Sequence, residues 1–135
     1  MHNNQPELDA LIGAARQARE RAYAPYSRFA VGAAALTASG RVFPGCNIEN
    51  AAYPSTICAE RVALTSAYAA GERDVVALAV VADTSGPVSP CGTCRQVIHE
   101  LAPNATVVLA NMGAAFQVVT PRELLPFGFD SSELP

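Results

Sequence analysis

The sequence contains no lysine, and all nine of its Lys and Arg residues are arginines. Schiff-base chemistry through a lysine side chain is therefore excluded. The chain also lacks any apolar run approaching the roughly 18 residues that indicate a transmembrane helix. Its formal net charge is −3 and its isoelectric point about 5.3, and no basic stretch is evident that would meet a nucleic-acid backbone. These absences argue against a membrane protein or a binder of nucleic-acid polymers, and they favour a small, uncharged or weakly charged ligand.

The chain also lacks a recognisable targeting signal. Residues 1–7 are polar and do not show a basic segment followed by an apolar one. We therefore expect the protein in the cytoplasm, where clustered cysteines indicate metal binding or catalysis more often than disulfides. The 135 residues, of which 50% are hydrophobic, predict a single domain over 1–135 with a sizeable core.

Three of the four cysteines lie in two short motifs that predict the two halves of one metal site. Cys91 and Cys94 are three positions apart, a spacing that lets one turn of backbone present two sulfurs to one ion. Cys58 lies 33 positions upstream of Cys91 (91 − 58), so only the fold can bring it close. Three thiolates fill three corners of a tetrahedral Zn²⁺ site and leave the fourth for water. Glu60, two residues beyond Cys58, is then a candidate to move the proton of that water.

Other interpretations of the cysteines are open at this stage. Cys91 and Cys94 alone resemble a thioredoxin-like redox pair, but that interpretation leaves the first motif without a role. Cys46 could supply a fourth thiolate and close a purely structural site, although a free cysteine is often buried as a small hydrophobe. His99, five positions beyond Cys94 (99 − 94), is expected too far along its helix to reach the ion.

The charged pair after Cys58 also has two interpretations. Glu60 alone would be a good first-turn helix residue, favoured by the helix dipole. Arg61 alone would be a surface residue. Beside three thiolates and Zn²⁺, whose charges sum to −1, a cation that hydrogen-bonds the sulfurs would offset the excess negative charge.

Hydrophobic periodicity predicts an alternation of helices and strands along the whole chain. Helices are expected over 7–22, 58–71, 91–101 and 121–125. Strands are expected over 29–37, 41–47, 75–82, 106–110 and 115–119. The short turns at 38–40 and 111–113 predict antiparallel pairs, and the central β-α-β-α-β order predicts parallel pairing with right-handed crossovers. We therefore expect an α/β fold, a three-layer α/β/α sandwich around a mixed five-stranded sheet, with both cysteine motifs at helix N-termini that favour thiolates.

Cys-Ala-Glu-Arg at 58–61, followed by Pro-Cys-Gly-Thr-Cys-Arg-Gln at 90–96, closely resembles the cytidine deaminase family. The resemblance extends in the same order through Tyr-Ser-Arg-Phe at 26–29, Val-Gly-Ala-Ala at 31–34, Gly-Cys-Asn-Ile-Glu-Asn at 45–50 and Glu-Leu-Leu-Pro at 123–126. It covers nearly the whole chain. Cysteine rather than histidine as the first ligand resembles the short, homotetrameric branch of the family.

The resemblance implies a reaction and a set of roles. It implies zinc-dependent hydrolytic deamination of cytidine and deoxycytidine to uridine and deoxyuridine, a reaction of pyrimidine salvage. Glu60 would pass the water proton to N3 and later protonate the departing amine. It further implies that Asn47 and Glu49 hold the ribose 3′-hydroxyl, that Phe29 packs on the pyrimidine, and that the main chain of Ala59 contacts the base. Taken alone, Asn47 also suits a strand-ending turn and Phe29 also suits core packing.

The resemblance also implies a homotetramer with active sites shared between subunits. In this interpretation Phe129 reaches across to the pyrimidine pocket of a neighbour. The tail departs from the family pattern, because Phe127 adds an aromatic residue and no Gly-Pro follows Phe129. Phe127 is therefore the alternative cross-subunit aromatic residue.

Two rival functions remain from the sequence. One is a zinc-stabilised binding module without activity. The other is a deaminase of a different cytosine-bearing compound, such as a nucleoside antibiotic. Asn47 and Glu49 argue against the second, because the deaminases of such antibiotics lack a clear equivalent of that stretch.

Overall fold

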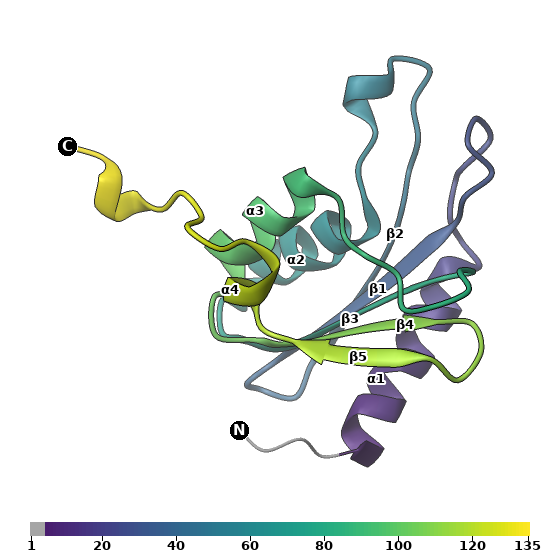
Figure 1. The fold of residues 1–135 in the computed structure, drawn as a ribbon, viewed down its shortest axis with the longest axis horizontal. Helices are drawn as coiled ribbons and strands as arrows, with labels where there is room; N and C mark the ends of the chain where they lie inside the picture. The colour runs from purple at the N-terminus through teal and green to yellow at the C-terminus, as the bar shows by residue number, and fades with distance from the viewer. Residues whose placement is uncertain (1–4) are drawn as a thin grey trace.

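The structure is a computed structural model that describes residues 5–135, and it contains one mixed sheet between helical layers (Figure 1). Residues 1–4, part of the segment in which no targeting signal is expected, lie outside the described residues. The helices are α1 (Gln5–Arg19), α2 (Ala59–Ala69), α3 (Gly92–Leu101) and α4 (Pro121–Leu124), with short 3₁₀ turns η1 (Tyr53–Ser55) and η2 (Ser131–Glu133). The strands are β1 (Val31–Thr37), β2 (Val42–Cys46), β3 (Val75–Ala82), β4 (Thr106–Asn111) and β5 (Phe116–Val119). None of the helices in 5–135 is long and apolar enough to span a membrane.

The strands are ordered β2-β1-β3-β4-β5 across the sheet. The β1–β2, β1–β3 and β4–β5 pairs are antiparallel, and the β3–β4 pair is parallel. The predicted mixed five-stranded sheet is therefore confirmed, but the expected parallel pairing of β2 with β3 is wrong, because β1 lies between them. Pro44 explains the arrangement physically: it cannot donate a ladder hydrogen bond, which suits an edge strand such as β2 and not a central one.

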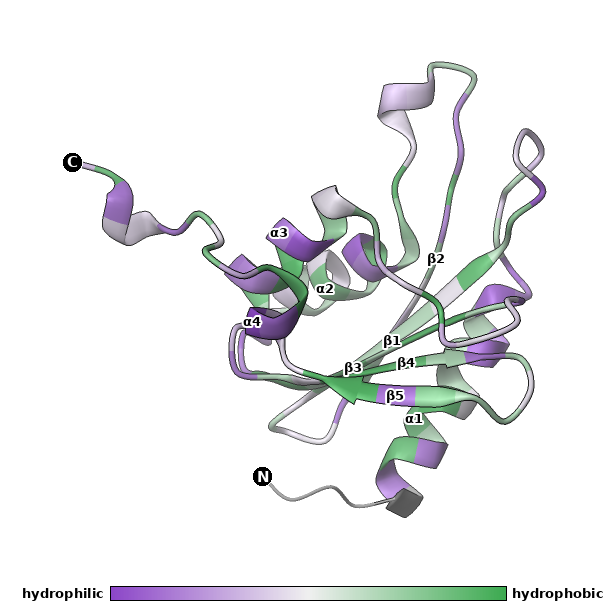
Figure 2. Cartoon of the chain, viewed as in Figure 1, coloured by the Kyte–Doolittle hydropathy of each residue, from purple (hydrophilic) through white to green (hydrophobic). Residues whose placement is uncertain are grey.

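The sheet separates two hydrophobic cores, which gives the predicted three layers. On one face, Leu8, Leu11, Ile12 and Ala15 of α1 pack on alternate residues of β1, β3 and β4. On the other face, α2 and α3 cover the remaining inward-facing residues of the same strands. Figure 2 shows the strands as mostly hydrophobic, whereas the helices carry hydrophilic segments.

Two glycines allow the helices to approach the sheet very closely. A Cβ added at Gly32 would lie 2.0 Å from the carbonyl oxygen of Ala15 in α1. A Cβ added at Gly45 would lie 2.4 Å from the carbonyl oxygen of Ala59 and 2.5 Å from the amide nitrogen of Ala63, both in α2. Gly45 therefore fixes the distance between β2 and the helix that follows Cys58.

The largest boundary differences lie around residues 20–30. The helix predicted to 22 ends at Arg19, and the strand predicted from 29 begins at Val31. The chain leaves the helix because the Tyr23 amide donates to the carbonyl of Asn47. Arg28 then adopts a φ of 59°, so residues 28–30 cannot extend β1.

The carboxyl-terminal tail begins after α4, whose first turn is stabilised by a capping box between Thr120 and Glu123. Beyond Leu125 the chain runs away from the helical layer (yellow in Figure 1). Phe127 is fully exposed and Phe129 is 52% exposed. The tail thus presents two aromatic side chains that the described chain does not bury.

Candidate metal centre and substrate pocket

Three cysteine sulfurs converge where α2 and α3 begin. Cys58 is the N-cap of α2, Cys91 is the N-cap of α3, and Cys94 lies in the first turn of α3. Their Sγ atoms all lie within 4.8 Å of one another, and those of Cys58 and Cys91 are 3.9 Å apart. The Cys94 amide donates to Cys91 Sγ at 3.4 Å, as expected at the positive end of a helix. The fold thus assembles the group predicted from the two motifs.

The donor set fits Zn²⁺, which prefers thiolates in tetrahedral geometry. Among residues 5–135, no fourth Cys, His, Asp or Glu joins this group. Cys46 stands outside it as a free thiol at the end of β2, and His99 Nε2 lies 4.0 Å from Asp130 in the tail. The closed structural site considered from the sequence therefore lacks its fourth ligand within the described chain. Three ligands suit a metal that keeps one open position.

The thiols of Cys58 and Cys94 differ in acidity, because their pKa values are shifted in opposite directions. Hydrogen bonding with Cys94 is the largest cause that lowers the pKa of Cys58, to about 5, and Arg61 lowers it further. The Arg61 Nη2 atom lies 3.7 Å from Cys58 Sγ and donates to the Thr56 carbonyl at 3.0 Å. The contact with Cys58 and burial raise the pKa of Cys94. Of these two thiols, Cys58 loses its proton more readily, and a metal would displace the proton of Cys94.

Glu60 lies in the first turn of α2, close to these sulfurs. Its side chain is 4% exposed, and this burial is the largest cause that raises its pKa. The negative charge of Cys58 raises the pKa further, whereas a hydrogen bond with Cys94 lowers it. Burial thus makes the Glu60 carboxylate a stronger proton acceptor than an exposed one, which suits a group that accepts and returns a proton.

A cavity of about 210 Å³ opens next to the sulfurs. It is lined by most of the site residues that the sequence predicts. They come from the segment before β1, the β2–η1 segment and the starts of α2 and α3. Its lining consists of Ser27, Phe29, Val31, Asn47, Glu49, Thr56, Cys58, Ala59, Glu60, Val80, Val88, Ser89 and Cys91. The structure therefore brings cysteines of the candidate metal site, the buried Glu60 carboxyl and polar side chains together at one cavity.

Asn47 and Glu49 order the segment that carries Phe29. The side chain of Asn47 is 7% exposed, donates through Nδ2 to the Phe29 carbonyl at 2.7 Å, and accepts from the Val31 amide at 2.9 Å. One Glu49 oxygen accepts from the amides of Tyr26 and Ser27 at 2.9 and 3.1 Å, and the other accepts from the Ser27 hydroxyl. The Ser27 hydroxyl is the largest cause that lowers the pKa of Glu49.

Several cavity residues were missed by sequence reasoning. Ser27 and Thr56 stand beside predicted residues and line the cavity with hydroxyl groups. Val88 and Ser89 belong to the loop that leads to Cys91. Ser27 carried a signal in the sequence, since it lies within the 26–29 motif, but nothing in a hydropathy pattern distinguishes Val88 or Ser89.

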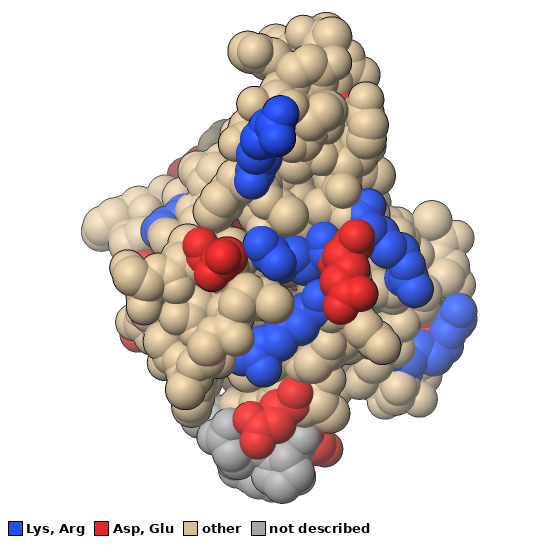
Figure 3. Space-filling model, turned by 90° about the vertical axis from the view of Figure 1, so that its right-hand side faces the viewer, with Lys and Arg blue, Asp and Glu red and all other residues tan. Residues whose placement is uncertain are grey.

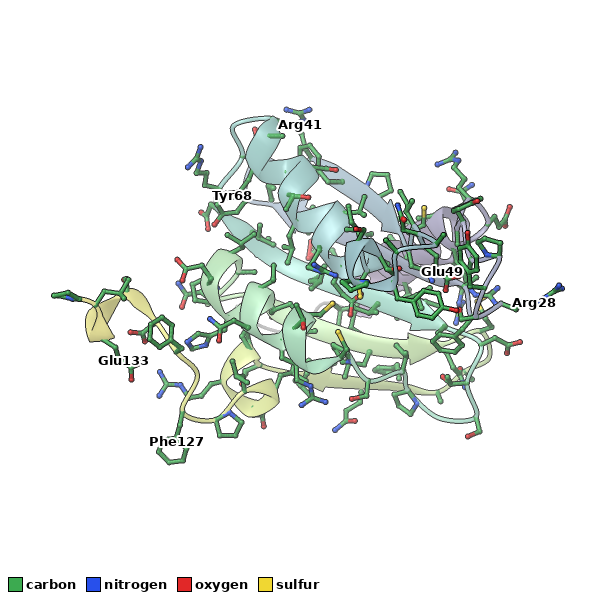
Figure 4. The ribbon with its side chains drawn as sticks, turned by 90° about the horizontal axis from the view of Figure 1, so that it is seen from above. Arg28, Arg41, Glu49, Tyr68, Phe127 and Glu133 are labelled. Atoms are coloured by element: carbon green, nitrogen blue, oxygen red, sulfur yellow. The ribbon has the colours of Figure 1, made fainter. Side chains whose placement is uncertain are left out.

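Cys94 and Arg61 lie against the other cysteine sulfurs but do not line the cavity. Phe129 is the one predicted site residue that neither lines the cavity nor contacts those sulfurs. Its carbonyl accepts a hydrogen bond from Gln96 Nε2 at 2.9 Å, which ties the tail to α3. In Figure 4 the tail with Phe127 and the segment with Glu49 occupy opposite ends of the molecule. Neither aromatic residue of the tail can therefore be placed in the pocket of its own chain.

Three thiolates with an open coordination position beside a buried carboxyl define a zinc-dependent hydrolytic enzyme. The family model for the cytidine and deoxycytidylate deaminase zinc-binding region matches residues 6–110. The chain is 58% identical over 125 residues to a cytidine deaminase of Halalkalibacterium halodurans, covering 92% of this chain and 95% of the relative. It is 50% identical over 129 residues to a cytidine deaminase of Sporosarcina psychrophila, covering 95% of each. The crystal structure of the Burkholderia pseudomallei cytidine deaminase matches with a TM-score of 0.88 and 56% identity, covering 90% of this chain and 98% of that one. The chain belongs to the cytidine deaminase family, as its motifs indicated.

Proposed function

We propose that this protein catalyses the zinc-dependent hydrolytic deamination of cytidine and deoxycytidine to uridine and deoxyuridine, releasing ammonia. The observation that carries the proposal is the single cavity in which Cys58 and Cys91 meet Glu60, Asn47 and Glu49. The family membership supports the same reaction.

Glu60 carries the protons in this reaction. Zn²⁺ held by Cys58, Cys91 and Cys94 would act as a Lewis acid that lowers the pKa of a water molecule. The Glu60 carboxylate takes one proton of the attacking water, whose oxygen bonds to C4, and passes this proton to N3 of the pyrimidine. It then takes the proton of the resulting C4 hydroxyl and gives it to the amine, so that the C4–N bond breaks, ammonia leaves and the C4 carbonyl of uridine forms. One carboxyl serves first as base and then as acid, a task that its raised pKa suits.

Arg61 offsets negative charge at the three cysteine ligands. Three thiolates would make the site strongly anionic, which weakens the acidifying effect of the metal. The guanidinium donates to Cys58 Sγ while its contact with the Thr56 carbonyl holds it in place. Arg61 therefore offsets part of the negative charge without occupying a coordination position.

Phe29, Ala59, Asn47 and Glu49 bind the nucleoside. Phe29 packs on the pyrimidine and the main chain of Ala59 contacts it. Asn47 uses one amide hydrogen internally and keeps the second for the ribose 3′-hydroxyl. Glu49 already accepts three hydrogen bonds, so about one lone-pair position remains for the same hydroxyl. An anionic acceptor there would repel a 3′-phosphate, which disfavours 3′-nucleotides and polymers.

The arginines give no reason to invoke a polymer substrate. Arginines and acidic residues lie interspersed on the face drawn in Figure 3. This distribution does not form the continuous basic track that a nucleic-acid backbone requires. The face drawn in Figure 3 therefore gives no support for a polymer substrate.

The decisive experiment follows the ultraviolet absorbance of cytidine with zinc-loaded protein, and the matched control is the same protein carrying Glu60→Gln. Loss of the cytidine spectrum in the wild type and not in the variant supports the proposal. If zinc-loaded wild type leaves cytidine unchanged, the protein is a zinc-stabilised binding module instead. Turnover of a cytosine-bearing antibiotic nucleoside without turnover of cytidine would identify the other rival.

We further infer that the protein is a cytoplasmic homotetramer of single-domain subunits, 1–135, with active sites shared between subunits. Phe129 is half exposed and lies outside the cavity of its own chain, which leaves it available to a neighbour. An aromatic side chain across the interface would exclude water and stack on the base without adding charge. Phe127, which is fully exposed, is the alternative residue for this role.

Complementation between two inactive variants tests the shared site. Glu60→Gln and Phe129→Ala proteins are co-expressed, and the activity of purified mixed tetramers is compared with the weighted mean of the two pure variants. Sites that combine an intact Glu60 with an intact Phe129 from another chain should raise activity above that mean. Activity equal to the mean would rule out Phe129 in trans, and the same experiment with Phe127→Ala then tests the alternative.

A further inference from the structure

The loop between β3 and α3, residues 83–91, supplies one wall of the cavity. Val88 and Ser89 line the cavity, and Cys91 belongs to the metal group. The loop has no regular secondary structure, and the Val88 amide reaches only a long hydrogen bond of 3.4 Å to the Ala110 carbonyl. Arg95 of α3 holds the end of the loop next to Cys91, because it donates through Nε to the Pro90 carbonyl at 2.9 Å and through Nη2 to Ser89 Oγ at 2.6 Å. The beginning of the loop, at Thr84 and Ser85, is held by a different side chain.

Asn111, the last residue of β4, joins this loop to the β4–β5 turn. Its side chain is 7% exposed and donates through Nδ2 to the carbonyls of Thr84 at 2.9 Å and Ser85 at 3.2 Å. Its Oδ1 accepts from the amides of Gly113 at 2.9 Å and Ala115 at 3.1 Å. The two Nδ2 hydrogens thus bind the 83–91 loop and Oδ1 binds the β4–β5 turn. A single buried amide side chain therefore links the two segments.

Arg16 of α1 holds the same turn from the other side. Its Nη2 atom donates to the carbonyls of Asn111 at 3.1 Å and Gly113 at 2.6 Å. The turn is thereby tied to the helix that covers the opposite face of the sheet. Asn111 consequently sits on a rigid support from which its donors can fix the more irregular loop.

We propose that Asn111 is a positioning residue for the active site. It holds the beginning of the 83–91 loop while Arg95 holds the end, and both anchors are needed to keep Val88, Ser89 and Cys91 in place. Asn111 does not line the cavity and therefore acts through the loop and not on the substrate. The inference deepens the proposed function. Its consequence for zinc retention can be tested without any substrate.

The competing interpretation is that Asn111 only shapes the β4–β5 turn. The chemistry of the amide separates the two interpretations. Asn111→Asp is nearly isosteric and keeps the acceptor for Gly113 and Ala115, but it loses both donors and faces the Thr84 and Ser85 carbonyls with a negative charge. A residue needed only for the turn would tolerate this change, whereas an anchor of the loop would not.

The experiment compares Asn111→Asp with wild type and with Asn104→Asp, the same chemical change at an exposed position of the turn between α3 and β4. Zinc release from the loaded protein to a chromophoric chelator is followed first. Release requires Cys91 to move, so loss of two net hydrogen bonds should accelerate it by between about fivefold and a hundredfold. Asn104→Asp should release zinc at the wild-type rate.

Cytidine kinetics per bound zinc give the second readout. A loosened Val88–Ser89 wall should raise KM for cytidine by more than it lowers kcat. Wild-type zinc release in a folded Asn111→Asp protein overturns the proposal, and so does faster release with an unchanged KM. If the wild type does not turn over cytidine at all, the proposed function fails while the zinc-release comparison still decides the role of Asn111.

If the Asn111→Asp protein does not fold, amide hydrogen exchange in the zinc-loaded wild type tests whether Asn111 couples the loop to the turn. The Val88 amide bonds to Ala110 beside the loop anchor, and the Gly113 and Ala115 amides bond to the Asn111 side chain. Coupled segments open together, so the three amides should show similar opening free energies. Val88 exchanging more than about tenfold faster than the other two would show that the side chain does not couple the segments.

Discussion

Replacing Gly45 with alanine tests whether the close approach of β2 and α2 sets the geometry of the active site. The added Cβ would lie 2.4 Å from the Ala59 carbonyl oxygen, whereas ordinary contact begins at 3.4 Å. The helix would have to withdraw by about 1.0 Å (3.4 − 2.4). Both of the nearest atoms belong to the backbone of α2, so no side chain can rotate to relieve the clash.

The expected effects are large in both stability and activity. Overpacking of this kind costs about 3 kcal/mol, which for a domain of this size lowers the melting temperature by roughly 10 °C. Withdrawal of α2 also moves Cys58 and Glu60 relative to Asn47 on the far side of the cavity. A displacement of about 1 Å in an active site can lower turnover by ~10²-fold.

The assay combines thermal unfolding at one fixed protein concentration with cytidine turnover normalised to bound zinc. Gly13→Ala is the matched control, because Gly13 lies in α1 and a Cβ there meets nothing within 4 Å. Alanine in place of a helical glycine should stabilise that variant by about 0.5–1 kcal/mol and leave turnover unchanged. A Gly45→Ala protein with wild-type stability and turnover would refute the reasoning that this glycine sets the position of α2.

Three further predictions address individual side chains of the site. Cys58→Ala should lose zinc and activity while Cys46→Ala keeps both, as measured by metal content and turnover; zinc loss from Cys46→Ala would indicate a closed structural site. Glu60→Gln should bind zinc normally and lose about 10²–10⁴-fold in kcat, whereas near-normal turnover would reassign this residue to the helix terminus. Glu49→Ala should weaken cytidine turnover and leave the poor turnover of free cytosine little changed, because only the nucleoside offers a 3′-hydroxyl; equal losses on both substrates would contradict a ribose contact.

The metal group could be predicted from the sequence because its signals are local. Cys91 and Cys94 share one helical turn, and Glu60 follows Cys58 within two residues. Helix geometry brings Cys91 and Cys94 together because they are three positions apart. Glu60 is kept near Cys58 because only one residue separates them in the chain. The one long-range step, from Cys58 to Cys91, followed from placing both motifs at helix N-termini beside the same sheet.

The strand order and the loop residues were harder to predict for a different reason. Periodicity shows that a segment is a strand but not which strand lies beside it, so β2 was expected next to β3. Pro44 carried the missing information, since it excludes β2 from a central position. Val88 and Ser89 lie in an irregular loop to which Asn111 and Arg95 donate side-chain hydrogen bonds, and such bonds leave no repeating pattern in a sequence.

The placement of Cys58 and Cys91 as the N-caps of α2 and α3 also affects the unfolded chain. A zinc ion shared by these residues closes a loop of 33 positions (91 − 58), as a disulfide between them would. In the chain-entropy treatment of cross-links, a loop of this length is worth about 4 kcal/mol against unfolding. The loop contains α2 and β3, so the cross-link spans the segment that forms the centre of the sheet and much of one helical layer. The same ion would thus serve catalysis and act as a covalent-like staple, one that needs no oxidising compartment and that a chelator can remove.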